Sequence, residues 1–195
     1  MAFLRSSADS EIRPVVRADG LILRTPLAAD YASWADLRAD SRAHLVPWEP
    51  QWAEDELSRV AYKLRLRHYD RELRERVGYA FFVFRAVDNA LIGGLTLSNV
   101  RRGVTQTCTI GYWIGKPYVG NGHMTSAVKA IRGFAFDGLR LHRVEAACLP
   151  SNAPSIRVLE KAGFRREGLA RKYLKINGAW QDHLLFASLS DDAAP

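Results

Sequence analysis

The architecture of this 195-residue chain follows from one segment, Gly111-Tyr112-Trp113-Ile114-Gly115-Lys116-Pro117-Tyr118-Val119-Gly120-Asn121-Gly122-His123-Met124. Its first part ends a β-branched and aromatic run over 105–114, which predicts a strand. Its last part opens a run over 124–136 in which apolar residues recur at helical spacing. The glycines between them permit a tight turn and the close approach of a ligand. The segment therefore predicts a strand, a turn and a helix whose first N–H groups suit an anion such as a pyrophosphate.

Strand and helix signals alternate on both sides of this segment. Upstream, we expect strands at 21–24, 79–87 and 91–97, helices at 28–37 and 53–76, and a loop or broken helix at 38–51. Downstream, we expect a strand at 142–149, a helix at 155–162, and two strands within 172–189 that meet at the hairpin signal Asn177-Gly178. No repeat or linker divides the series. We therefore expect a flexible N-terminus at 1–13 and a single α/β (α+β) domain at 14–190, with a mixed central sheet of about seven strands flanked by helices.

The composition is that of a globular protein with excess positive charge. Hydrophobic residues make up 48%, charged residues 25%, and the net charge is +7. No apolar run reaches the ~20 residues that span a bilayer, and the first residues lack the features of a signal peptide, so we expect a cytoplasmic location. The basic residues are scattered and no nucleic-acid motif is present, so we expect no direct nucleic-acid recognition.

Cysteine usage argues against a metal site or a disulfide. Cys108 and Cys148 lie in β-prone runs, where we expect them to be buried free thiols. No set of three or four ligands has the spacing of a metal site, so we expect none.

A second segment that bears on chemistry starts at Asn152. It reads Asn152-Ala153-Pro154-Ser155 and continues with Leu159, Lys161, Gly163 and Phe164. Taken alone, Asn and Ser at a helix start are more often caps than ligands, and a Gly-x-Gly turn is a weak motif. Together and in this order, the two segments resemble the acetyl-CoA motif and the Asn-x-x-Ser…Lys-x-Gly-Phe segment of the GNAT superfamily.

Further stretches narrow the resemblance to the ribosomal-protein-alanine N-acetyltransferases of the RimJ type. They are Leu45-Val46-Pro47-Trp48-Glu49-Pro50, Leu97-Ser98-Asn99-Val100, Gly111-Tyr112-Trp113-Ile114-Gly115, Leu141-His142-Arg143 and Gly178-x-Trp180-x-Asp182-His183. The resemblance covers 21–189 and implies a GNAT acyl-CoA N-acyltransferase fold with acetyl-CoA as cosubstrate. Pro117 departs from the family pattern, which has Gln or Arg there, so one polar contact to the cofactor is lost.

The resemblance also implies a set of site residues. For the cofactor they are Trp113, Ile114, Tyr118, Val119, Gly120, Asn121, Gly122, His123, Met124, Asn152 and Lys161. The catalytic residues are Ser155, as hydrogen-bond donor to the sulfur, and Glu49, and the acceptor is expected against Trp48, Glu49 and Asn99. His123 is expected to contribute its backbone. Asp182 and His183 stay open as proton carriers, and Trp180 is expected in the core.

The base that takes the proton of the amine is not identified. The residues that do proton chemistry in related enzymes align with Ala147, Leu159 and Leu174, none of which exchanges a proton. An α-amine with pKa ~7.8 is already about a tenth neutral at pH 7, whereas a lysine at ~10.4 is under ~0.1% neutral. Water relayed to a carboxylate suffices for the α-amine, and Glu49 is the candidate. The alternative for Glu49 is a solvated loop charge.

We therefore expect an acetyl-CoA-dependent N-acetyltransferase that acts on the N-terminal amine, Ala or Ser, of a ribosomal or other protein by direct attack on the thioester. One alternative keeps the chemistry and takes a small-molecule amine, an antibiotic or polyamine, as acceptor. Another is a non-catalytic acyl-CoA-binding or ribosome-associated protein. The oligomeric state, monomer or homodimer, stays open.

Overall fold

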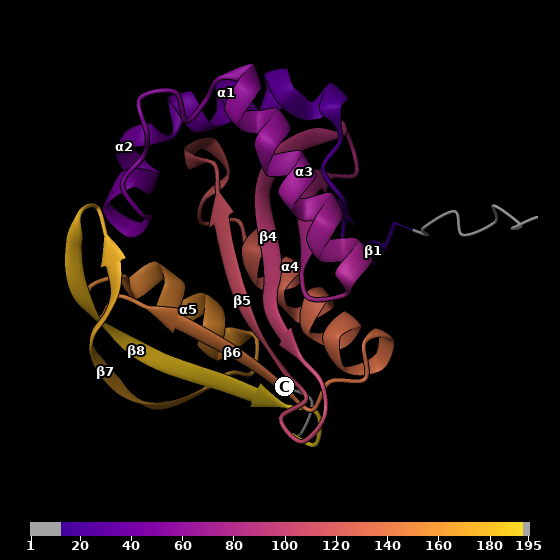
Figure 1. Cartoon of the computed structure of the whole chain (residues 1–195), viewed down its shortest axis with the longest axis vertical. Coiled ribbons are helices and arrows are strands. Elements are labelled where there is room, and N and C mark those ends of the chain that lie inside the picture. Colours follow the sequence, from indigo (N-terminus) through magenta and orange to yellow (C-terminus); the bar gives the residue numbers. More distant parts are fainter. Residues whose placement is uncertain (1–12, 193–195) are drawn as a thin grey trace, which may run out of the picture.

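The computed structural model describes residues 13–192, which form one mixed sheet of eight strands with helices on both faces (Figure 1). The predicted flexible N-terminus lies, apart from Arg13, outside the described residues. The strands are β1 (Val15–Ala18), β2 (Leu21–Arg24), β3 (Tyr79–Arg85), β4 (Ala90–Arg101), β5 (Thr107–Ile114), β6 (Arg143–Cys148), β7 (Arg165–Ile176) and β8 (Ala179–Leu189). Their order in the sheet is β1-β2-β3-β4-β5-β6-β8-β7, and only the β5–β6 pair is parallel.

Five α-helices cover this sheet. They are α1 (Tyr31–Asp40), α2 (Arg42–Leu45), α3 (Arg59–Glu75), α4 (His123–Gly133) and α5 (Ala153–Lys161). Short 3-10 turns occur at Ala28–Asp30, Val46–Trp48 and Lys116–Tyr118, and a π-helical turn at Phe134–Gly138 extends α4. The mixed α/β architecture is therefore confirmed, and the expected break between 38 and 51 is the α2 turn with its 3-10 continuation.

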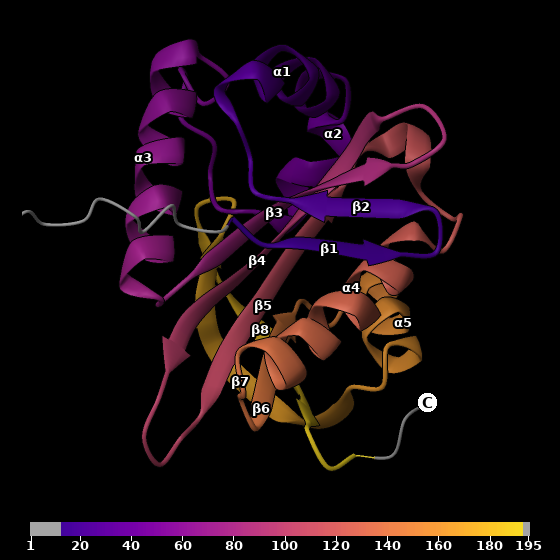
Figure 2. The same cartoon turned by 90° about the vertical axis from the view of Figure 1, so that its right-hand side faces the viewer.

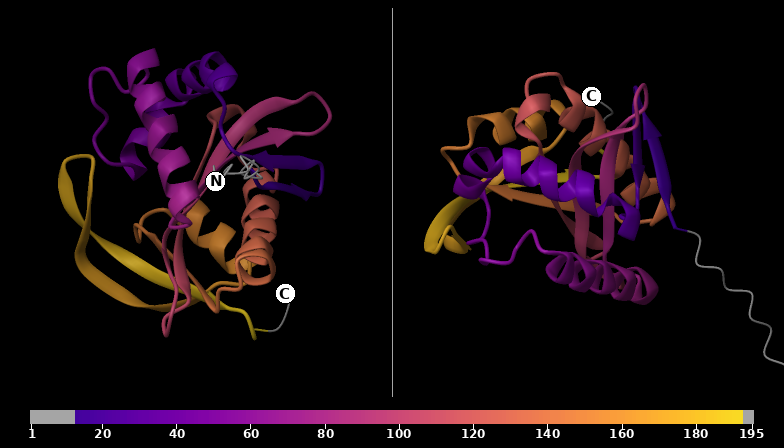
Figure 3. Two further views of the ribbon diagram at one scale, coloured as in Figure 1. Left: turned by 45° about the vertical axis from the view of Figure 1, so that its right-hand side comes forward. Right: turned by 90° about the horizontal axis from the view of Figure 1, so that it is seen from above.

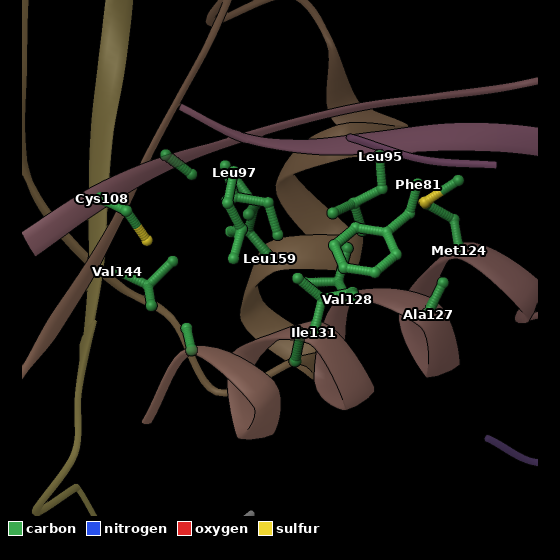
Figure 4. Packing of buried hydrophobic residues seen from close by; sticks show 14 of the residues in the cluster. Phe81, Leu95, Leu97, Cys108, Met124, Ala127, Val128, Ile131, Val144 and Leu159 are labelled. Carbon is green, nitrogen blue, oxygen red and sulfur yellow. The ribbon is translucent and has the colours of Figure 1, made fainter. Parts of the chain in front are cut away.

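The two faces of the sheet have separate cores. Figure 2 and Figure 3 show α4 and α5 on one side of the strands and α3 on the other. Under α4 and α5 lies the larger core (Figure 4), where Phe81, Leu95, Ile131 and Leu159 are at most 1% exposed. Burying each such side chain contributes about 1.5–3 kcal/mol. The smaller core joins Trp34 of α1, Tyr62 of α3 and three residues of β3 and β4, Phe82, Phe84 and Leu91.

Several element boundaries differ from the expected ones. Helix α3 starts at Arg59, not at 53, because Ser58 caps it by accepting a hydrogen bond from the Ala61 N–H at 3.1 Å. The extra strand, β1, was missed because its four residues are exposed or half-buried and lack the apolar run that marks β2. Strand β7 starts at Arg165 rather than near 172, because its edge position leaves it largely exposed and without apolar alternation.

The burial of three single residues can be compared with its prediction. Cys108 and Cys148 are free and buried, as expected. The placement of Trp180 in the core was wrong, since the side chain is 61% exposed near the tip of the β7–β8 hairpin. Among residues 13–192, no helix combines the length and apolarity needed to cross a membrane. The same residues contain no cluster of three or more His, Cys, Asp or Glu side chains able to hold a metal ion.

Candidate active site

The sheet opens into a wedge between β5 and β6. These strands pair only at their starts, where Thr107, Cys108 and Thr109 face Arg143, Val144 and Glu145. Beyond this point β5 stays paired with β4 alone, and β6 with β8 alone, so the two strands diverge toward their carboxyl ends (Figure 1). The facing strand edges keep backbone N–H and C=O groups that can pair with an extended ligand. Trp113 and Ile114, two of the expected cofactor residues, lie on the diverging half of β5.

The glycine turn lies directly after β5. Gly120 and Gly122 have φ of 83° and 77°, a region that favours glycine, and a Cβ built on either one meets no atom within 4 Å. Gly122 is the N-cap of α4 and supplies no side-chain cap. The first N–H groups of α4 therefore point out of the helix with its positive dipole end, which makes the turn a site for an anion.

The expected cofactor residues of this turn differ in exposure. Val119, Gly120, Asn121 and Gly122 are exposed, and Tyr118 and His123 are half-buried. Met124 is buried in the core under α4, so only its backbone is available to a ligand. Pro117 lies in the 3-10 turn that leads into the loop.

The start of α5 faces the same wedge. The side-chain oxygen of Asn152 caps α5 by accepting a hydrogen bond from the Ser155 N–H at 3.1 Å. The hydroxyl of Ser155 lies 2.8 Å from the hydroxyl of Tyr112 on β5, so this contact bridges the wedge. Burial raises the pKa of Tyr112. Lys161 lies at the other end of α5, about 13.5 Å along the helix axis from the cap residue Asn152, and the structure does not bring it to the wedge.

A cavity of about 400 Å3 adjoins β5. Its walls are aromatic and charged, with Trp34, Arg38, Glu49, Pro50, Gln51, Trp52, Glu56, Arg65, Tyr69, Phe82, Thr96, Gly111, Tyr112 and Trp113 lining it. Because Tyr112 and Trp113 also belong to the diverging half of β5, the cavity and the wedge meet at this strand.

The charged wall of this cavity centres on Arg38, which is 6% exposed. Its guanidinium donates two hydrogen bonds to Glu49, Nη2 to Oε2 at 2.5 Å and Nη1 to Oε1 at 3.2 Å. Trp52 donates a third, from Nε1 to Oε2 at 2.8 Å. The guanidinium carbon also lies 4.5 Å from the ring centre of Trp52 and 5.0 Å from that of Trp113. Glu49 therefore lines the cavity with both of its oxygens already engaged.

A second cavity, of about 610 Å3, lies beside the β7–β8 hairpin. Trp48 lines it together with Pro47, Leu149, Pro150, Ser151, Lys172, Trp180, Gln181 and Asp182. The tip of the hairpin contacts the loop that contains Glu49. There the Asn177 N–H donates a hydrogen bond to the Glu49 carbonyl at 2.9 Å. The Asp182 carboxylate accepts the Lys172 N–H at 2.8 Å, and His183 is 3% exposed. Asp182 and His183 are thus held within the hairpin.

The structure does not bring Asn99 to either cavity. It is exposed at φ 52° in a bulge of β4, between the Ser98–Thr109 and Arg101–Thr107 pairs. Conversely, the sequence interpretation assigned no role to Arg38 or Tyr112. The alternation of β5 places Tyr112 and Trp113 on opposite faces, and that signal could have identified Tyr112. Arg38 has no such signal, because charged residues surround it in α1.

Comparison with known proteins finds relatives over most of the chain. The model of the acetyltransferase (GNAT) domain matches residues 20–165. The chain is similar to the [ribosomal protein uS5]-alanine N-acetyltransferase of Escherichia coli K12, with 34% identity over 93% of this chain and 95% of that protein. It is 41% identical to the probable N-acetyltransferase YjcK of Bacillus subtilis, over 80% of this chain and 86% of that protein.

Two solved structures share the fold along almost the whole chain. The ribosomal-protein-S5-alanine acetyltransferase of Vibrio fischeri has a TM-score of 0.84 and 32% identity, covering 93% of this chain and 100% of that one. RimJ of Mycobacterium smegmatis in complex with CoA-disulfide has a TM-score of 0.84 and 33% identity, covering 91% of this chain and 86% of that one.

Proposed function

The chain belongs to the GNAT acetyltransferase family and uses acetyl-CoA, and we propose that it acetylates the N-terminal α-amine, Ala or Ser, of a ribosomal or other protein. Acetyl-CoA supplies the acetyl group as a reactive thioester. The chain's own residues then have three tasks: to hold the cofactor, to hold the amine beside β5, and to stabilise charge on the sulfur and the carbonyl oxygen.

The wedge fits the cofactor. The open space above Gly120 and Gly122 and the uncapped start of α4 suit the pyrophosphate. The free edge of β5 at Trp113 and Ile114 suits the extended arm, and a backbone N–H there is available to a developing oxyanion. Asn152 has its oxygen engaged in the cap, so its NH2 group is the part that binds the arm. Ser155 is the proposed donor to the sulfur.

Gly122 gives this assignment a direct test. We expect Gly122→Val to weaken acetyl-CoA binding at least about tenfold, because a branched side chain fills the space that the phosphates need and disfavours a φ of 77°. Gly103→Val is the matched control. Gly103 also has a positive φ, 70°, and a Cβ built there meets no atom within 4 Å, but it lies in the turn between β4 and β5. Isothermal titration measures both. Equal affinities in the two folded variants would contradict the assignment of the phosphates to this turn.

The proposed acceptor is supported by one observation above all: Glu49 has both oxygens engaged by Arg38 and Trp52. The other cavity carboxylate, Glu56, is likewise paired with Arg65. A cavity without a free carboxylate suits an amine that is already partly neutral at pH 7, which is the property of an N-terminal α-amine. In the proposal, the negative charge of Glu49 attracts the amine, and the proton of the amine leaves to water.

The segment Pro47–Trp52 supports a peptide as acceptor over a small amine. Its first residues, Pro47 and Trp48, line the larger cavity, and Glu49 to Trp52 line the smaller one. A peptide with its first residue beside Glu49 can extend past Trp48 toward the β7–β8 hairpin. The aromatic and apolar surface of Trp48 and Trp180 suits such a chain. A compact small amine gains nothing from the larger cavity.

Release of CoA thiol with a panel of acceptors tests the proposal. We expect turnover with peptides that carry a free N-terminal Ala or Ser, and little turnover with spermidine or an aminoglycoside. Preference for the small amines would select the small-molecule alternative. Tight acetyl-CoA binding without turnover of any acceptor would select the non-catalytic one.

A further inference from the structure

We propose that Tyr112 is a positioning residue, whose hydroxyl holds the Ser155 hydroxyl in the orientation that donates to the cofactor's sulfur. The inference rests on the proposed role of Ser155. It adds to that role a residue on the opposite wall of the wedge, which fixes the direction of the donated hydrogen bond.

The contact that carries the inference joins two elements far apart in sequence. The Tyr112 hydroxyl lies 2.8 Å from Ser155 Oγ and 3.3 Å from the Ser155 carbonyl oxygen. Tyr112 lies on the half of β5 that no longer pairs with β6, and Ser155 lies in the first turn of α5. The Asn152 cap holds the backbone of Ser155, so only the rotation of its hydroxyl stays free. The Tyr112 hydroxyl and the Cys148 thiol face that rotation, and the Tyr112 hydroxyl lies at 2.8 Å from Ser155 Oγ.

Each of the two hydroxyls carries one hydrogen, which leaves two arrangements. In one, Ser155 donates to Tyr112, and Tyr112 donates to the Ser155 carbonyl. In the other, Tyr112 donates to Ser155 Oγ, and the hydrogen of Ser155 points into the wedge. A negative sulfur selects the second, because hydrogen bonds to a charged acceptor are the stronger ones. The Tyr112 hydrogen bond then prevents Ser155 from turning away.

A relay of protons through Tyr112 is the alternative, and the surroundings of the ring disfavour it. Burial raises the pKa of Tyr112, and the hydrogen bond with Ser155 only partly offsets this effect. A tyrosinate left in the core would lack a cationic partner, since the groups that face its hydroxyl are Ser155 and the thiol of Cys148. Tyr112 therefore keeps its proton and acts through orientation.

The ionisation of bound CoA provides a readout that does not depend on turnover. The ultraviolet absorbance of the thiolate reports the pKa of the CoA thiol in the complex. Burial raises the pKa of Cys148 and raises that of Cys108 to about 12, and a titration of the protein without CoA is subtracted to remove the absorbance of its own thiols and tyrosines. We expect Tyr112→Phe to raise the pKa of bound CoA by about one unit, because Ser155 then donates less often to the thiolate.

Turnover gives the second readout. We expect Tyr112→Phe to lower kcat about tenfold with little change in KM for acetyl-CoA, since the lost interaction belongs to the departing sulfur. Ser155→Ala should lower kcat at least as much, and adding Tyr112→Phe to it should change nothing further. Tyr31→Phe is the matched control, because it also removes a half-buried hydroxyl, one that donates to the Leu57 carbonyl at 2.9 Å. It should leave both the thiol pKa and kcat unchanged.

The outcomes separate the inference from the function on which it rests. If Tyr112→Phe has its full effect in the Ser155→Ala background, Tyr112 acts independently of Ser155 and the inference is wrong. If Tyr112→Phe leaves the thiol pKa unchanged while Ser155→Ala raises it, Ser155 needs no positioning and the inference is wrong as well. If Ser155→Ala changes neither the thiol pKa nor kcat, the proposed role of Ser155 fails instead.

Discussion

Replacing Arg38 with methionine should lower the free energy of unfolding by about 3 kcal/mol. Arg38 is 6% exposed, and its guanidinium donates twice to Glu49 and lies near the rings of Trp52 and Trp113. Methionine retains much of the apolar volume but leaves the Glu49 carboxylate, whose side chain is 20% exposed, without its cationic partner. The cost is therefore that of an uncompensated charge more than that of a cavity. Urea denaturation monitored by tryptophan fluorescence measures it.

Two further variants test whether the uncompensated charge of Glu49 causes the loss of stability. The double variant Arg38→Met, Glu49→Leu should recover much of the loss, because an apolar pair can replace a buried ion pair at little cost. Arg13→Met removes an exposed pair with Asp70, whose side chains are 43% and 35% exposed, and should change stability by less than about 1 kcal/mol. If the double variant is no more stable than the single one, packing of the guanidinium explains the loss, not its charge.

The Arg38→Met variant should also affect peptide binding and acetyl-CoA binding differently. Acetyl-CoA affinity should stay close to that of the unmodified protein, since Arg38 contacts the ring of Trp113, whereas the proposed cofactor contact there uses the backbone of β5. Peptide KM should rise, because Arg38 shapes the wall that holds Glu49. A parallel loss of acetyl-CoA affinity would mean that Arg38 supports the whole domain.

The sequence predicted the parts of the molecule that depend on neighbouring residues. The glycine turn after β5 and the cap of α5 are local, so their residues stand within a few positions of one another. The order of strands and helices likewise followed from the two hydrophobic periods. Strand β7 was underestimated because an exposed edge strand does not need apolar alternation.

The side-chain contacts on which the chemistry of the site depends join residues that are far apart in the sequence. Tyr112 and Ser155 are 43 positions apart in the sequence. Their hydroxyls meet because β5 and β6 diverge, so that Tyr112 on β5 faces the start of α5. The expectation for Glu49 placed it near the acceptor but did not reveal its partner in α1. Trp180 was expected in the core, and only the position of the hairpin shows that it lines a cavity.

A peptide with a free α-amine and no lysine should be acetylated about 300 times faster at pH 7 than an N-blocked peptide with one lysine, if the cavity holds both amines equally well. The ratio is that of the neutral fractions, since the two pKa values differ by about 2.6 units, or ~3.5 kcal/mol of deprotonation. It applies because the two carboxylates of the cavity, Glu49 and Glu56, are paired with Arg38 and Arg65. A site without a free base cannot make up the difference for the lysine.

The pH dependence distinguishes this explanation from a simple fit of the peptide. Between pH 7 and pH 9 the α-amine becomes almost fully neutral while the lysine gains about a hundredfold in neutral fraction, so the ratio should fall to roughly 25. A preference due to the shape of the cavity would stay constant over the same range. Initial rates of thiol release for the two peptides, measured from pH 6.5 to 9, give both numbers. Faster acetylation of the blocked lysine peptide at neutral pH would rule out the α-amine as acceptor, because it would require a base that neither Glu49 nor Glu56 is free to supply.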